Sequence, residues 1–226
     1  MPTKMKPPEV DLLKLLNSSD CANLLNDFTL QRFPKKTLVY SPFEERNLVF
    51  IVKSGRLRVY LSYEDKEFTL AFLGAGDIFS THTPTFVQAL EGAEILVCNT
   101  RKYQQQLFAI PEVSLITVKV LGELLKNSIS TIEGLAFKDV RRRLVEYLIK
   151  AEADQGRRTT AGSVVELGVS TEDIALLIGT TRQSISQILN EFIKNDIIEK
   201  INRRTILIKN LAALKIMEDS SERQAF

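Results

Sequence analysis

The sequence predicts an α+β protein in which an antiparallel β-domain is followed by a long helix and a winged helix-turn-helix. Residues 31–103 contain short apolar and β-branched runs separated by turn-forming residues, the pattern of an antiparallel sandwich or barrel. After Pro111 apolar residues recur at spacings of three and four, which predicts one long helix. Residues 171–190 show the apolar positions, small residue and glycine of a helix-turn-helix.

Length and composition narrow the possible classes of protein. A chain of 226 residues with 44% hydrophobic and 26% charged residues is typical of two globular domains. No apolar run approaches the ~18 residues of a membrane span, and no secretory signal is evident, so we expect a cytoplasmic protein. Cys21 and Cys98 are too few for a disulfide scaffold, a structural zinc site or a four-cysteine iron–sulfur cluster.

The first expected elements are a short amphipathic helix from Val10 to Leu16 and then the strands of the β-domain. The clearest strand patterns lie in residues 38–40, 48–52 and 57–61. We expect hairpin turns at Ser54-Gly55 and across residues 63–67, where glycine or charged residues interrupt the apolar runs. The first domain is predicted to cover residues 1–110.

The long helix is expected over residues 111–136. Its apolar stripe consists of Val118, Leu121, Leu125, Ile129, Ile132 and Leu135. A helix of roughly 35 Å, at 1.5 Å per residue, is longer than a small β-domain needs as cover. Part of the stripe should therefore face a second subunit, which predicts a homodimer. The alternative is a helix packed only on its own β-domain.

A hinge of Phe137, Lys138 and Asp139 is expected to separate this helix from a second one. Asp139 is suited to cap the second helix. Its apolar face consists of Val140, Leu144, Leu148 and Ala151. Gly156 and the polar stretch after it, to Gly162, are expected to end this helix. The last domain is predicted to cover residues 140–226.

The helix-turn-helix is predicted from its packing and turn residues. Its small core is Ile174, Ile178, Ile185 and Ile188. Ala175 is small where the two helices cross, and Gly179 suits a turn that needs positive φ. Thr180 and Gln183 have the spacing of a capping box, so the second helix should start near Thr181.

The second helix and the hairpin after it carry side chains suited to reading DNA. Arginine pairs with guanine and glutamine with adenine in the major groove. The candidate DNA contacts on the helix are Thr181, Arg182, Gln183, Ser184 and Gln187. A β-hairpin over residues 197–208 should form a wing with Arg203 and Arg204 at its tip, suited to phosphate. Arg182 and Gln183 could simply solvate a helix start, but the whole constellation favours sequence-specific binding to double-stranded DNA.

This order of elements, over about residues 31–211, resembles the CRP/FNR family of bacterial transcription regulators. The resemblance implies a cupin-like antiparallel β jelly-roll effector domain, dimerisation through the long helix, and effector-dependent reorientation of the DNA-binding domains about the hinge. It also implies RNA polymerase as a partner and transcriptional activation. The exposed turn of residues 64–67 could touch the polymerase, although a solvated hairpin turn is the simpler interpretation.

The sequence lacks residues that two classes of effector would require, which narrows the choice of effector. No Arg or Lys occurs between Glu67 and Thr100, and a buried phosphate without a cation is costly. Cyclic nucleotide is therefore disfavoured. Cys21 stands alone where the iron–sulfur members have several cysteines. Residues 74–83 are instead similar to the haem-ligand segment of the carbon-monoxide-sensing members. Residues 48–61 and 132–139 are also similar to the corresponding stretches of those members.

This resemblance implies haem b (iron protoporphyrin IX) with His82, the only histidine, as an axial ligand of the iron. Asn47 stands at the position whose side chain orients the imidazole. The second ligand of the family's ferrous state is the amino group of the mature N-terminus, here Pro2 after removal of Met1. A neutral terminal amine can be displaced by carbon monoxide. The alternative for His82 is a structural or surface role.

Gly122 is unexpected within the long helix, where glycine costs ~1 kcal/mol relative to alanine. A flat macrocycle against the helix, with Val118, Leu121 and Leu125 as an apolar pocket for carbon monoxide, accounts for it. Close approach of two helices at a dimer seam accounts for it almost as well.

One departure from the carbon-monoxide-sensing members is Ser80, where they have a cysteine that binds the ferric iron. A serine cannot supply a thiolate, so the ferric ligand is open; Cys98 lies in a run expected to be core. Two other interpretations were weighed. A regulator of the same fold with a different effector and no haem is possible, whereas an enzyme on this barrel lacks the clustered His and acidic ligands of a usual metal site.

Overall fold

The computed structural model describes residues 27–44, 47–109 and 111–219. The expected helix from Val10 to Leu16, Cys21 and the Pro2 ligand lie outside the described residues. The chain divides into two compact units, and the boundary between them falls between Ser128 and Ile129. Each unit is described by itself.

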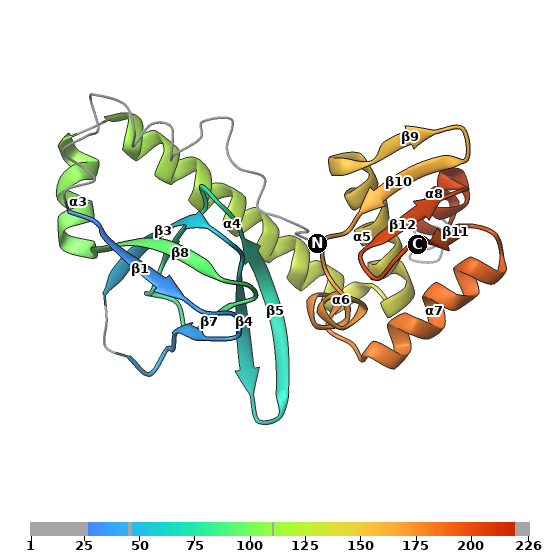
Figure 1. The fold of residues 1–226 in the computed structure, drawn as a ribbon, viewed down its shortest axis with the longest axis horizontal. Helices are drawn as coiled ribbons and strands as arrows, with labels where there is room; N and C mark the ends of the chain where they lie inside the picture. The colour runs from blue at the N-terminus through green and yellow to red at the C-terminus, as the bar shows by residue number, and fades with distance from the viewer. Residues whose placement is uncertain (1–26, 45–46, 110, 220–226) are drawn as a thin grey trace. The chain divides into compact units, whose positions relative to one another are not determined.

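In the described part of the first unit, the strands form two four-stranded antiparallel sheets (Figure 1). One sheet has the order β1-β8-β3-β6 and the other β2-β7-β4-β5. The strands are β1 (Thr29–Phe33), β2 (Leu38–Tyr40), β3 (Leu48–Ser54), β4 (Leu57–Tyr63), β5 (Lys66–Leu73), β6 (Ile78–Ser80), β7 (Phe86–Ala89) and β8 (Ala93–Asn99).

The core of this unit contains alternate residues from strands of both sheets. Phe50 and Val52 of β3 pack in one cluster with Leu57 and Val59 of β4, and all four side chains are buried. Alternation on a strand sends every second side chain to the same face. The predicted antiparallel sandwich is therefore confirmed.

The two expected hairpins have different outcomes. The turn between β4 and β5 is a hairpin as predicted, with Tyr63 paired to Lys66 across Glu64 and Asp65. The turn at Gly55 exists, with φ +82°, and a Cβ there would lie 2.3 Å from a backbone oxygen. It joins β3 to β4, however, and these strands belong to different sheets. The hairpin predicted at Ser54-Gly55 was wrong because the local turn signal does not say which strand will be the pairing partner.

Two helices follow the strands: α3 (Thr100–Ala109) and α4 (Pro111–Phe137). The long helix is continuous, as predicted. Its apolar stripe is exposed, from 45% at Leu135 to 67% at Val118, whereas Thr131 and Gly134 on another side are buried. Among the described residues, no helix has the length and apolarity required to cross a bilayer.

The second unit is built around a small sheet of order β11-β12-β10-β9 with helices around it (Figure 1). Its elements after α4 are α5 (Val140–Gln155), β9 (Arg157–Thr159), β10 (Gly162–Glu166), α6 (Thr171–Ile178), α7 (Arg182–Lys194), β11 (Ile198–Lys200), β12 (Thr205–Ile208) and α8 (Leu211–Asp219). Leu144, Leu148 and Ala151 of α5 are fully buried, whereas Val140 is half-buried. The expected polar stretch to Gly162 contains strand β9, which the sequence pattern did not predict.

Candidate DNA interface and effector site

The helix-turn-helix is formed by α6 and α7, and each end is fixed by a cap. Ser170 and Asp173 form a capping box at the start of α6. Gly179 adopts the left-handed conformation, φ 76° and ψ 50°, and its N–H donates to Ala175 O at 2.9 Å. The predicted roles of Ala175, which is 2% exposed, and of Gly179 are confirmed. The box at Ser170 was missed, although its Ser-x-x-Asp spacing is visible in the sequence.

The cap of α7 differs by one residue from the prediction. Thr181 is the N-cap, and its Oγ1 accepts from the Ser184 N–H at 3.2 Å and lies 2.9 Å from Ser184 Oγ. The capping box predicted at Thr180 and Gln183 was wrong, because Thr181, one residue later, caps the helix instead. The side chains of Thr181 and Ser184 are consequently hydrogen-bonded to each other at the start of the helix. Ile185 is fully buried in the motif, while Ile188 is half-buried.

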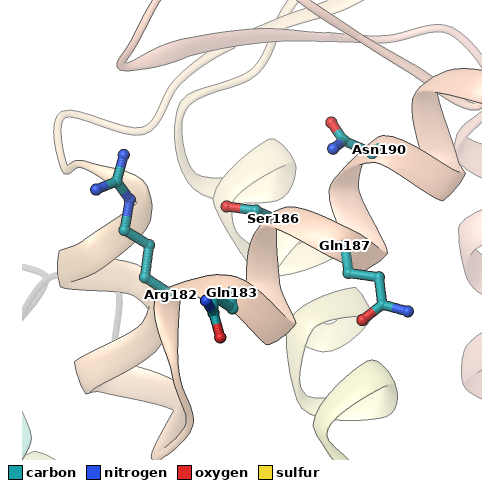
Figure 2. Close-up of a pocket in the computed structure, with 5 residues that line it drawn as sticks. All are labelled: Arg182, Gln183, Ser186, Gln187 and Asn190. Carbon is teal, nitrogen blue, oxygen red and sulfur yellow. The ribbon is translucent and has the colours of Figure 1, made fainter.

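The exposed side of α7 carries a row of neutral polar side chains and one arginine. Arg182, Gln183, Ser186, Gln187 and Asn190 line one shallow groove (Figure 2). Three of these residues were predicted DNA contacts. Ser186 and Asn190 were missed, although they follow Gln183 at the helical spacing of three and seven. No carboxylate lines this groove, so its surface suits an acidic or acceptor-rich partner such as a groove of DNA.

The predicted wing is confirmed as the hairpin of β11 and β12. Arg203 and Arg204 lie in its exposed connection, and neither forms an ion pair with any residue that the structure describes. Asn202 Oδ1 accepts from the Arg204 N–H at 2.8 Å, and Arg204 O accepts from the Leu167 N–H at 2.7 Å. The backbone of the basic tip is thus held in place while its guanidinium groups remain available.

The segment between α4 and α5 is held by caps and ion pairs. Asp139 is the N-cap of α5 as predicted, and its side chain accepts from the Arg142 N–H at 2.8 Å. Lys138 Nζ lies 3.2 Å from Glu133 of α4 and 3.0 Å from Glu146 of α5. Burial lowers the pKa of Lys138, but the hydrogen bonds to Glu146 and Glu133 outweigh it and leave the pKa raised. Phe137, the other hinge residue, is 83% exposed.

The effector segment is anchored at the end of β6. Ser80 pairs with Val49 of β3, and Thr81 continues the ladder, its N–H donating to Leu48 O at 3.0 Å. Tyr40 Oη donates to Thr81 O at 2.6 Å, and the Leu48 N–H donates to Thr81 Oγ1 at 2.9 Å. His82 follows in the turn after β6, and Asn47 directly precedes β3, where its main-chain oxygen accepts from the Thr100 N–H at 3.0 Å.

His82 is exposed, and its Nδ1 lies 2.6 Å from Ser80 Oγ. The predicted role of Asn47 in orienting the imidazole stays a prediction. With Nδ1 held by Ser80, Nε2 is the nitrogen left for a ligand or metal. From the sequence, Ser80 was recognised only as a missing thiolate, because its contact with His82 depends on the turn that the chain makes after β6.

The donor set of the described residues fits a haem and does not fit a metal ion held by protein side chains alone. No cluster of three His, Cys, Asp or Glu side chains occurs among the described residues. A haem iron needs one or two axial ligands from the protein, and an exposed imidazole is suitable. Cys98 is 2% exposed, and burial raises the pKa of its thiol, so it stays a neutral core residue as predicted.

The predicted apolar pocket residues on α4 are largely exposed. Val118, Leu121 and Leu125 are each more than half exposed. A Cβ added to Gly122 would meet nothing within 4 Å. No neighbour in the described chain therefore accounts for this glycine, which leaves a bound macrocycle or a second subunit as the two explanations already weighed.

Comparison with known proteins agrees with this organisation. Residues 30–109 match the family of cyclic nucleotide-binding domains, and residues 142–217 match the Crp-like helix-turn-helix domain. A mutant of CooA from Carboxydothermus hydrogenoformans is 50% identical in sequence. That match covers 97% of this chain and 100% of the other, with a TM-score of 0.92.

Two further structures are similar to parts or most of the chain. The heme domain of CooA from Carboxydothermus hydrogenoformans is 55% identical over 57% of this chain and 96% of its own, with a TM-score of 0.51. The reduced (FeII) CO-sensing protein from R. rubrum is 33% identical over 92% of this chain and 99% of its own, with a TM-score of 0.55. The chain is a transcription regulator rather than an enzyme, and it belongs to the CRP/FNR family, in which it is similar to CooA over nearly its whole length.

Proposed function

We propose that this protein is a haem-dependent, carbon-monoxide-responsive transcription regulator that binds DNA as a homodimer. The observation that carries the proposal is His82. It is the only histidine in the chain, it is exposed after the end of β6, and the contact of its Nδ1 with Ser80 leaves Nε2 as the ring nitrogen for a ligand. These are the properties of an axial ligand.

His82 would hold the haem through its imidazole, and Pro2 through its terminal amine after removal of Met1. The bound haem would supply the iron to which carbon monoxide binds. Val118, Leu121 and Leu125, beside Gly122, offer an apolar surface without hydrogen-bond donors, which suits a neutral diatomic ligand. The residues of this chain would therefore bind and orient the haem, and the N-terminus and the long helix would respond to the gas.

The output of the proposed switch is DNA binding. The exposed stripe of α4 is too apolar to remain in water, and a second copy of the helix would cover it. Two copies of α7 could then read two half-sites, with Arg203 and Arg204 on the flanking phosphates. We expect the dimer to act on cytoplasmic DNA and to activate transcription through contact with RNA polymerase.

A second candidate is a regulator of the same fold that binds another small molecule without haem. The match of residues 30–109 to cyclic nucleotide-binding domains favours it. The absence of Arg and Lys between Glu67 and Thr100 opposes a cyclic nucleotide, because the phosphate would lack a cation there.

An absorption spectrum separates the two candidates. The purified protein, expressed with an adequate supply of haem, should show a Soret band that shifts when carbon monoxide is added to the reduced form. His82→Ala should perturb this band, and Glu91→Ala, an exposed change on the loop before β8, should leave it unchanged. In gel shifts, carbon monoxide should strengthen binding to a selected DNA site. A colourless protein, or a Soret band indifferent to His82→Ala, contradicts the proposal.

A further inference from the structure

We infer that Ser80 is a positioning residue that holds the His82 imidazole in the tautomer required for iron ligation. The inference rests on the proposed haem function and assigns to Ser80 a role beyond the missing thiolate. Its basis is the 2.6 Å contact between Ser80 Oγ and His82 Nδ1.

The backbone around this contact is fixed by the sheet. Phe79 lies in the core of the sandwich, and Thr81 is 5% exposed and hydrogen-bonded to Tyr40 and Leu48. Ser80 ends β6 and is half-buried, and His82 lies exposed in the turn that follows. The anchored residues on either side of Ser80 therefore fix the backbone from which the hydroxyl and the imidazole approach each other.

The chemistry of imidazole explains why this neighbour matters. A neutral imidazole carries one proton, and iron at Nε2 requires that the proton be on Nδ1. A serine hydroxyl can accept that Nδ1–H, which selects this tautomer and the ring orientation together. A serine adds no charge to the ligand, unlike a carboxylate. Since the hydroxyl is committed to His82, the residue at position 80 supports the histidine and does not exchange with it at the iron.

The test uses protein labelled with ¹⁵N-histidine in its reduced, carbon-monoxide-bound form. The single histidine makes the assignment unambiguous. An Nδ1–H signal should be visible while the proton is held by an acceptor. Ser80→Ala should lose this signal to exchange with water, Ser80→Thr should retain it, and Glu91→Ala, an exposed change on the loop before β8, should also retain it. Removing the hydrogen-bond partner of a metal-ligating histidine also lowers metal affinity about 10–100-fold. The Ser80→Ala protein should therefore lose its haem faster than the unaltered protein when mixed with a haem-accepting protein.

The outcomes separate failure of the role inferred for Ser80 from failure of the proposed haem function. If Ser80→Ala keeps both the signal and the haem release rate, while Asn47→Ala loses the signal, the acceptor is Asn47 and the inference about Ser80 is overturned. The same holds if Ser80→Thr behaves like Ser80→Ala. If the unaltered protein binds no haem, or His82→Ala leaves the spectrum unchanged, the proposed function itself fails.

Discussion

Arg143 donates from its Nε to the main-chain oxygen of Ile178 at 3.0 Å, joining the start of α5 to the last residue of the first helix of the DNA-binding motif. Its Nη1 also donates to Lys138 O at 2.5 Å and to Gly134 O at 3.3 Å. The side chain is 7% exposed. One buried guanidinium thus binds carbonyls near the C-terminal ends of two helices, where backbone acceptors lack helical partners and the helix dipole favours a cation.

Replacing Arg143 by Leu should destabilise the C-terminal unit. Three carbonyls would lose a charged donor, and such losses cost about 1–3 kcal/mol each when the acceptor stays buried, so we expect a decrease of at least about 3 kcal/mol in the free energy of unfolding. Urea denaturation followed by circular dichroism measures it. Arg157→Leu, an exposed change on β9, should stay within about 0.5 kcal/mol. Equal effects of the two variants would show that the carbonyl contacts of Arg143 contribute nothing.

The ion pair of Glu191 on α7 with Arg141 on α5 predicts a specific pH dependence. The hydrogen bond from Arg141 holds the pKa of Glu191 below its ordinary value, which is about 4.3 in an unfolded chain. The stabilisation is therefore present above about pH 4.3 and is lost as the pH falls through the lower, folded value. The stability difference between the protein and Glu191→Gln should be constant near neutral pH and shrink in acid. When Arg141 is also replaced by Gln, the stability difference caused by Glu191→Gln should no longer depend on pH in this way. If the pH dependence persists, it comes from a group other than the Arg141–Glu191 pair.

The groove on α7 and the wing should contribute to DNA binding in different ways. Arg182→Ala and Gln183→Ala should each cost about 1–3 kcal/mol on the preferred site and relax the choice of base. Arg203→Ala should weaken binding to all sequences and reduce the dependence of log affinity on log salt by about one unit. Fluorescence anisotropy with a selected site and a scrambled site, across a salt series, separates the two effects. If both α7 variants still distinguish the selected site from the scrambled site as well as the unaltered protein does, α7 is not the helix that recognises the bases.

Part of the exposed stripe of α4 should form the dimer seam. Ile132, which is 65% exposed in the single chain, would become buried between two helices. Ile132→Glu should place a charge in that seam and convert dimers to monomers at micromolar concentration, because an unpaired buried carboxylate is strongly unfavourable. Lys126→Glu changes the charge on the same helix outside the stripe and should leave the dimer intact. Sedimentation velocity measures both; a monomeric unaltered protein, or a dimeric Ile132→Glu, contradicts the prediction.

Several features followed from the sequence because neighbouring residues decide them. The positive φ at Gly179, the cap at Asp139 and the length of α4 depend on residues within a turn or two of one another. The same locality made Arg182, Gln183 and Gln187 recognisable as one exposed side of a helix. Where two local signals competed, as Thr180 and Thr181 did for the start of α7, the pattern was misassigned by one residue.

Other features depended on contacts between residues far apart in the chain, and only the tertiary structure decided them. Gly55 makes a turn in either case, but the hydrogen bonds of β3 to β6 and β8 place it between two sheets instead of in a hairpin. Arg143 was an unremarked charge until the fold brought Ile178, 35 positions later, against its guanidinium. Sequence determined the local conformations and the chemical types at the sites, because backbone preferences act over a few residues. The tertiary structure decided strand partners and buried polar contacts, because those depend on which distant groups share the space left by packing.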